Sequence, residues 1–230
     1  MPPGAGVFVV LEGGDGSGKT GALAHLAPAL ADVPGGLLLT REPGGTGEGQ
    51  AIRALLLARG VHHWDPQAEL LLVAAARAQH VARVIRPALA AGRVVVSDRY
   101  VGSTLAYQGA GRGLPEAEIR TVHALTTGDL WPDLTVVLDV DPELALARGL
   151  ARLRAEGSRE DRFESLGLAF QRRVCASFLA QAAAAPERHA VIDAGRSIAA
   201  VHADVAATVL GFLRRKEGQG FAEPTKVTGA

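Results

Sequence analysis

The chain has 230 residues, 48% hydrophobic and 21% charged, which is enough to bury the core of one domain, or of two at most. Its 24 basic and 24 acidic residues give a formal net charge of zero, so neither a nucleic-acid coat nor a membrane-binding surface is indicated. The single Cys175 excludes an internal disulfide. The chain begins without the layout of a signal peptide and has no apolar run near the roughly 18 to 20 residues that span a bilayer. We therefore expect a cytoplasmic protein that acts on a small molecule, with no nucleic-acid or membrane partner.

Short apolar runs predict five buried strands. They cover residues 7–11, 36–40, 94–97, 134–140 and 190–193. Segments with helical spacing lie between them, most clearly 66–91, 115–127, 142–154 and 163–185. Strands that alternate with helices predict an α/β fold in three layers, with a five-stranded parallel sheet covered by helices on both faces.

The predicted domain ends near residue 214. Periodicity is lost after Arg215, so we expect a single domain over residues 1–214 and a disordered tail over residues 215–230. Of the three lysines, Lys216 and Lys226 fall in this tail. Lys19 is then the one lysine of the folded body, which otherwise uses arginine for positive charge.

A glycine-rich segment after the first strand fits the pattern GxxxxGK[ST] and precedes a helix, which is the context that this phosphate-binding loop requires. Its residues are Gly13, Gly14, Asp15, Gly16, Ser17, Gly18, Lys19 and Thr20. Loop N–H groups can surround phosphate oxygens, and the helix N-terminus adds its positive dipole end. Lys19 would reach the β and γ phosphates, and the Thr20 hydroxyl would bind magnesium. The segment predicts ATP with Mg²⁺ as the phosphoryl donor.

An acidic residue follows the strand 94–97. Because ligands of a parallel sheet bind at the carboxyl ends of its strands, Asp98 should lie beside the phosphate-binding loop. We expect Asp98 to hold magnesium directly or through water. Asp139 ends another predicted strand and is the weaker alternative; we interpret it as a helix-start residue before Pro142.

Arginines crowd the region around the Gly157-Ser158 break. They are Arg148, Arg152, Arg154, Arg159 and Arg162. Phosphoryl transfer needs positive charge around the transferred group, so we interpret residues 148–162 as a mobile lid that closes arginines over the phosphates. A solvated helix face is the alternative. No guanine-reading NKxD segment occurs, which favours a small-molecule kinase over a GTPase.

Several collinear segments together resemble the bacterial thymidylate kinases. They are LEGGDGSGKT, TREPGGT at 40–46, ARAQH at 76–80, SDRYVGSTLAYQGAGRGL at 97–114 and DRFE at 161–164. The resemblance extends from Val7 to about Leu213. It implies a P-loop NTPase-type fold with a lid, transfer of phosphate from ATP to dTMP to give dTDP, and a homodimer.

The resemblance also implies the roles of acceptor-site residues by position. Asp15 would approach the deoxyribose 3′-hydroxyl, and Tyr107 would fill the space of a ribose 2′-hydroxyl. Arg41 and Arg99 would hold the acceptor phosphate, a task that suits a guanidinium fork. The remaining substrate-binding positions, which include the base-recognising pair Arg77 and Thr104, are Val73, Arg77, Thr104 and Gln108.

The implied catalytic residues surround the transferred group. They are Lys19, Asp98, Arg99, Arg152 and Arg159. Some members of the family carry an arginine at the position of Gly16, whereas this chain, like the bacterial type, would supply catalytic arginines from the lid.

Val73 departs from the family pattern, which often has a phenylalanine there. Valine can touch a thymine ring but cannot stack on it. Two alternatives therefore stay open at this stage: a related P-loop kinase with another nucleotide or a small metabolite as acceptor, and a nucleotide-binding regulator that has lost the transfer reaction.

Overall fold

The computed structural model describes residues 6–58, 63–156 and 162–220. Its central element is a 5-stranded sheet with strand order β2-β3-β1-β4-β5. All neighbouring strands are parallel. The strands are β1 Val7–Glu12, β2 Leu37–Arg41, β3 Val94–Asp98, β4 Leu134–Asp139 and β5 His189–Asp193. The predicted parallel α/β sheet is therefore confirmed, with strand boundaries within about one residue of those expected.

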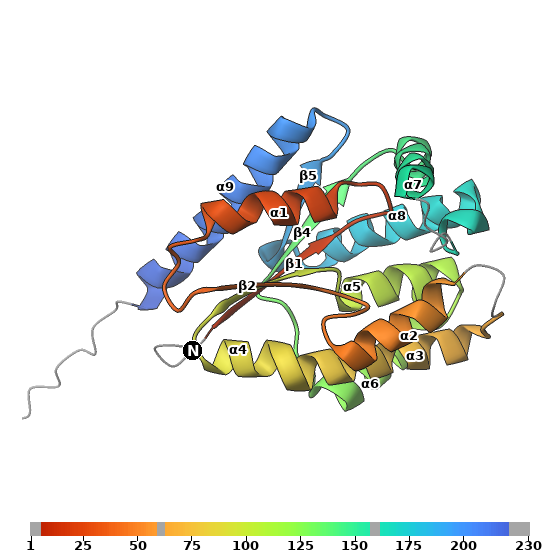
Figure 1. Ribbon diagram of the computed structural model, residues 1–230, viewed down its shortest axis with the longest axis horizontal. Helices are drawn as coiled ribbons and strands as arrows, with labels where there is room; N and C mark the ends of the chain where they lie inside the picture. Colours follow the sequence, from red (N-terminus) through yellow and green to blue (C-terminus); the bar gives the residue numbers. More distant parts are fainter. Residues whose placement is uncertain (1–5, 59–62, 157–161, 221–230) are drawn as a thin grey trace, which may run out of the picture.

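Helices cover both faces of the sheet (Figure 1). The α-helices are α1 Lys19–Ala29, α2 Gly47–Leu57, α3 Pro66–His80, α4 Arg86–Ala90, α5 Val101–Thr104, α6 Glu116–Thr127, α7 Pro142–Glu156, α8 Leu168–Ala184 and α9 Ile198–Gly220. Short π-helical segments at Val81–Ile85 and Leu105–Gly111 continue α3 and α5, and 3₁₀ turns occur at Glu164–Leu166 and Pro186–Arg188. Within the described ranges, no helix has the length and apolar character needed to cross a membrane.

Alternate residues of β1 point to opposite faces and so build two cores. Val9 and Leu11 pack with residues of α1 and α9, including Leu26 and Val205. Phe8 and Val10 pack on the other face, against the segment that joins α3 to α4. This double burial explains the apolar runs of the central strands β1, β3 and β4. The expectation of five buried strands was wrong for the edge strands β2 and β5, which are only partly buried because each has a neighbour on one side only.

The predicted long helical stretch 66–91 is confirmed as one path through α3, the Val81–Ile85 π segment and α4. Asp65 caps α3, since its side chain accepts a hydrogen bond from the Gln67 N–H at 2.9 Å, and Pro66 follows at the first helical position.

The expected tail boundary was wrong. Helix α9 continues past Arg215 to Gly220, and Lys216 donates a hydrogen bond to Asp133 at 3.0 Å. Asp133 Oδ2 in turn accepts the N–H of Phe8 at 2.9 Å. The end of α9 is thus tied to the start of the sheet, and residues 221–230 lie outside the described residues.

Candidate active site

The phosphate-binding loop lies between the carboxyl end of β1 and the start of α1, as the motif predicts. Gly16 has φ 83°, and a Cβ atom at this position would lie only 2.0 Å from the Ala145 carbonyl oxygen. The position therefore requires glycine, because α7 packs directly on the loop.

Lys19 is buried within this loop. Its Nζ donates to the carbonyl oxygens of Gly13 at 2.9 Å and Gly14 at 2.7 Å, and to Ser17 Oγ at 3.2 Å. Burial, together with the nearby Arg99 charge, lowers the pKa of Lys19 from 10.5 to about 8. Burial of the charged ammonium group therefore costs free energy, and an anionic ligand beside Lys19 would offset that cost.

Thr20 and Asp98 meet across the loop. The Thr20 hydroxyl donates to Asp98 Oδ2 at 3.0 Å. Asp98 Oδ1 is buried and has no hydrogen-bond partner among the described residues. A hydroxyl and a carboxylate with an unused oxygen are the donors that Mg²⁺ prefers, so these two residues fit the expected ion.

Two adjoining cavities open at this edge of the sheet. The first, which we call the phosphate cleft, is lined by Asp15, Gly16, Gly18, Lys19, Thr20, Gly21, Arg41, Glu42, Gln50, Arg53, Asp98, Arg99, Arg148, Arg152 and Leu153. The second, which we call the acceptor pocket, is lined by Asp15, Glu42, Pro43, Arg53, Leu56, Leu57, Val73, Arg77, Arg99, Tyr100, Ser103, Thr104, Tyr107, Gln108, Arg152 and Phe163. Five charged residues belong to both cavities, so the two spaces meet at charged groups. They are Asp15, Glu42, Arg53, Arg99 and Arg152. Asp139, the alternative to Asp98, lines neither of them.

Arg99, Asp15 and Tyr107 form a network where the cavities meet. Arg99 Nη2 donates to Asp15 Oδ1 at 2.5 Å, and the Tyr107 hydroxyl donates to Asp15 Oδ2 at 2.7 Å. Arg99 has a φ of 69°, which is uncommon for a residue other than glycine. Burial alone would raise the pKa of Asp15, but the charges of Arg99 and Lys19 outweigh it and lower that pKa below its usual value. Asp15 is therefore ionised at neutral pH.

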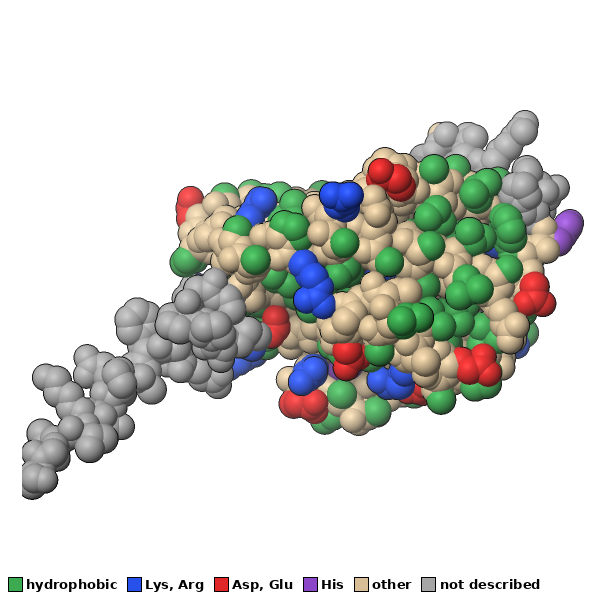
Figure 2. All heavy atoms as spheres, turned by 90° about the horizontal axis from the view of Figure 1, so that it is seen from below, with side chains coloured by type: hydrophobic (Ala, Val, Ile, Leu, Met, Phe, Trp, Pro, Cys, Tyr) green, Lys and Arg blue, Asp and Glu red, His purple; other side chains and the backbone are tan. Residues whose placement is uncertain are grey.

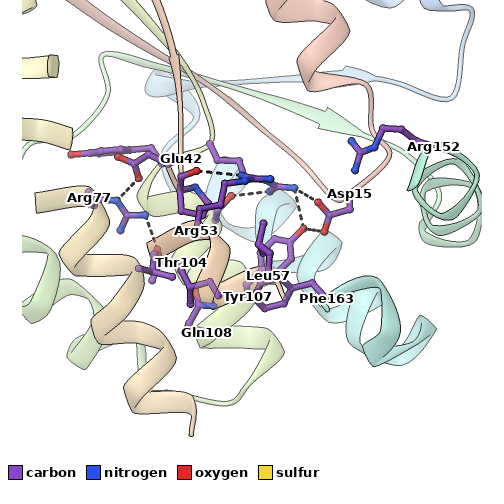
Figure 3. Close-up of a pocket in the computed structure, with 16 residues that line it drawn as sticks. Asp15, Glu42, Arg53, Leu57, Arg77, Thr104, Tyr107, Gln108, Arg152 and Phe163 are labelled. Atoms are coloured by element: carbon purple, nitrogen blue, oxygen red, sulfur yellow. Dashed lines mark hydrogen bonds and ion pairs between the residues drawn. The ribbon is translucent and has the colours of Figure 1, made fainter. Parts of the chain in front are cut away.

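Arg77 lies at the far end of the acceptor pocket, where Thr104 and Gln108 also line the wall (Figure 3). Its Nε donates to Glu42 at 2.7 Å and its Nη2 donates to Thr104 at 2.9 Å. Glu42 also bonds the buried His80 at 2.9 Å. Two hydrogen bonds thus fix the plane of the Arg77 guanidinium.

The expected lid arginines lie in different places. Arg148 and Arg152 project from α7 and line the phosphate cleft, and Figure 3 shows Arg152 directed toward Asp15. Arg162 is instead buried and paired with Glu69 at 2.7 Å, so its interpretation as a phosphate-facing arginine was wrong. Arg159 lies outside the described residues, and the lid as a whole stays a prediction.

Sequence reasoning missed several lining residues. Glu42 lies in the TREPGGT segment, Arg53 lies on α2, and Phe163 lies in DRFE. Glu12 ends β1, and an acidic residue directly after five apolar residues is a signal that sequence reasoning could have used. Its carboxylate accepts hydrogen bonds from the Tyr100 and Ser103 N–H groups. Burial, opposed in part by Arg99, raises the pKa of Glu12. Glu12 thus holds the start of α5, which carries Thr104.

Fold and site together define a P-loop nucleotide kinase. A phosphate cleft lies at the carboxyl ends of parallel strands, and it adjoins a second pocket that residues of α2, α3, α5 and the segment after α7 line.

The family model for thymidylate kinase matches residues 11–205. A thymidylate kinase of Cereibacter sphaeroides is 60% identical over 208 residues, which cover 90% of this chain and 96% of that protein. One of Pseudomonas fluorescens is 48% identical, with 93% and 99% covered. A crystal structure of thymidylate kinase from Ehrlichia chaffeensis superposes with a TM-score of 0.69 at 31% identity, covering 91% of this chain and 99% of that chain. The chain belongs to the thymidylate kinase family.

Proposed function

We propose that this chain transfers the γ-phosphoryl group of ATP to dTMP, giving ADP and dTDP. The observation that carries the proposal is the junction of the two cavities at Asp15, Arg99 and Arg152. A donor bound in the phosphate cleft and an acceptor bound in the adjoining pocket would meet there, which is the arrangement that an in-line transfer needs.

The donor half is supplied by the phosphate-binding loop. Loop N–H groups and Lys19 bind the β and γ phosphates, and Thr20 and Asp98 hold Mg²⁺. When bound, the ion offsets negative charge on the phosphate oxygens. Arg152, which reaches the junction from α7, adds positive charge where the transferred group lies, as would Arg159.

The acceptor half includes groups that hydrogen bonds already hold in place, such as Arg99, Asp15 and Arg77. Arg99 binds the dTMP phosphate together with the exposed Arg41 of the phosphate cleft, and Arg53, which lines both cavities, assists them. The Asp15 carboxylate accepts a hydrogen bond from the deoxyribose 3′-hydroxyl, while the Tyr107 ring occupies the space that a ribose 2′-hydroxyl would need. Arg77 and Thr104 recognise the base at the far end, where Val73 and Gln108 complete the wall.

A panel of nucleoside monophosphates tests this proposal by measuring ADP release with ATP and Mg²⁺. We expect strong turnover with dTMP, weaker turnover with dUMP, and none with purine nucleotides. Lys19→Ala serves as the inactive control, since loss of one electrostatic contact to the transferred group costs on the order of a hundredfold or more in kcat. Preference for another acceptor would favour the related-kinase alternative, and no turnover with any acceptor would favour the silent regulator.

We also propose that the chain forms a homodimer. Figure 2 views the face beneath α3 and α6 and shows hydrophobic side chains gathered on it. The neighbouring helices α2, α3 and α6 expose Leu55, Leu71 and Leu125. Exposed apolar side chains that gather on one face mark an interaction surface, and a second copy is the partner that the family resemblance favours. The expected cytoplasmic location stays a prediction.

A further inference from the structure

Phe163 brings an aromatic ring into the acceptor pocket from an element that sequence reasoning did not connect with it. Its ring lines the pocket and packs edge-on against Tyr107, with ring centroids 5.2 Å apart and planes at 81°. Figure 3 places Phe163 beside Tyr107 and Leu57, between the Arg77 end and the Asp15 end. Phe163 therefore lies on the sugar side of the pocket, as the roles proposed above for Asp15 and Tyr107 define it.

The ring is held by two arginines that share a buried acid. Arg162 and Arg112 place their guanidinium carbons 5.6 Å and 6.0 Å from the centre of the Phe163 ring, within the range of cation–π attraction. Both donate to the carboxylate of Glu69, Arg162 at 2.7 Å and Arg112 at 3.0 Å. Arg162 also donates to the Leu56 carbonyl oxygen at 3.0 Å.

Glu69 is a fully buried carboxylate on α3. Besides the two arginines, it accepts the amide N–H of Gln108 at 2.8 Å. A buried carboxylate is stable only when it is fully paired, and here the pairing joins α3, the π segment after α5 and residues 162–163. Glu69, Val73 and Arg77 are spaced by four residues, so they share one side of α3. One side of α3 therefore carries both the anchor and two residues of the pocket wall.

We propose that Phe163 is a specificity-determining residue of the acceptor pocket and that Glu69 is the positioning residue that holds it there. The inference rests on the proposed function. Phe163 fixes the Tyr107 ring from the side, so that Tyr107 keeps the space that a ribose 2′-hydroxyl would need. It also supplies aromatic surface to a pocket in which Val73 replaces the phenylalanine that is common in the family.

The role of Phe163 is tested by Phe163→Leu, with Phe170→Leu as the matched control. Both phenylalanines contact Tyr107 and Arg112 through their rings, but only Phe163 lines the pocket. In Phe163→Leu we expect KM for dTMP to rise on the order of tenfold, while KM for ATP stays within about twofold of the wild-type value. The kcat/KM preference for dTMP over its ribonucleotide counterpart should fall several-fold. Phe170→Leu should lose stability, measured by urea denaturation, and keep that preference.

Glu69→Gln tests the second part, with Glu116→Gln as its control because Glu116 forms an exposed ion pair with Arg120. The amide keeps the size of Glu69 but not its charge, so its hold on the two arginines weakens. We expect the same change in sugar preference as in Phe163→Leu, though smaller, with KM for ATP unchanged. If Glu69 had a purely structural role, Glu69→Gln would lower the free energy of unfolding and leave the kcat/KM preference for dTMP unchanged.

The outcomes separate the inference from the function on which it rests. If wild type fails to phosphorylate dTMP, the proposed function is wrong. If wild type phosphorylates dTMP but Phe163→Leu and Glu69→Gln keep the wild-type preference for deoxyribose, the function stands and this inference is wrong. An equal loss of preference in Phe170→Leu would likewise overturn it, since packing alone would then explain the effect.

Discussion

Lys19 shows how a single charge is prepared for its ligand. Its ammonium group donates hydrogen bonds to loop carbonyl oxygens and to Ser17, and burial with the nearby Arg99 lowers its pKa to about 8. Phosphate oxygens would reverse that shift, because negative charge favours the protonated form. Binding of ATP is therefore coupled to the protonation of Lys19.

This coupling predicts a pH dependence. The kcat/KM for ATP reports the free enzyme, so it should fall above about pH 8, by roughly tenfold per pH unit once Lys19 is mostly neutral. The kcat itself should stay flat to higher pH, because bound ATP keeps Lys19 protonated. Initial-rate kinetics from pH 6.5 to 10 measure both. In Lys19→Arg, whatever its absolute rate, the alkaline fall should be absent, since a guanidinium stays charged; a flat kcat/KM in wild type up to pH 10 would contradict the argument.

The residues that could be predicted are those whose spacing is local. Lys19 and Thr20 follow from one contiguous motif, and Asp98 from its place at the end of an apolar strand. Glu69 and Phe163 could not be predicted, because their shared network joins segments far apart in the chain through Arg162. Arg162 itself was misplaced for the same reason: sequence proximity to other arginines does not reveal that a buried acid on α3 holds it.

Among the elements, the strands were the easiest to predict and the irregular helices the hardest. The central strands β1, β3 and β4 are apolar because both faces of the sheet are covered there. Helix α2 was missed because its first turn contains Gly47 and Gly49, which disfavour helix, although Thr46 caps it by accepting the Gly49 N–H at 2.9 Å. The π segment Leu105–Gly111 has no pattern of its own in the sequence, yet it carries Tyr107 and Gln108, in keeping with the frequent presence of π turns at functional sites.

Helix α9 gives a prediction at the scale of elements. Its residues from 215 onward were expected to lie in a tail, so what holds this end of the helix can be tested. Val201, Val205, Val209 and Leu213 recur every four residues and are buried against the sheet. We expect Leu213→Ala to lower the free energy of unfolding by about 2 to 3 kcal/mol. Lys216→Ala, which removes a partly exposed ion pair with Asp133, should cost less than about 1 kcal/mol. Urea denaturation of both variants checks this, and a larger loss in Lys216→Ala than in Leu213→Ala would show that packing does not hold this end of the helix.

At the scale of the whole molecule, the acceptor pocket shares two helices, α2 and α3, with the apolar face at which Leu55, Leu71 and Leu125 are exposed. Helix α2 provides Leu56 and Leu57 to the pocket, and α3 provides Val73 and Arg77. The same two helices expose Leu55 and Leu71 on their other sides. A partner molecule packed on that face would therefore brace the helices that form the pocket wall, so we expect dimerisation to support acceptor binding.

Leu71→Glu tests this connection. Leu71 is 59% exposed on α3, and a twofold interface would bury it in both copies, so one substitution removes apolar contact twice and places two carboxylates in an apolar setting. Light scattering after gel filtration should give twice the chain mass of 23.8 kDa for wild type and a monomer at micromolar concentration for the variant. Ile198→Glu, at a residue that is 73% exposed at the start of α9, is the matched control and should remain dimeric. In the Leu71→Glu monomer we expect an increased KM for dTMP with KM for ATP little changed, because α2 and α3 bound the acceptor pocket, whereas the phosphate-binding loop joins β1 to α1. A wild-type protein that is monomeric at these concentrations would overturn the dimer proposal, and a monomeric variant with wild-type KM for dTMP would separate dimerisation from acceptor binding.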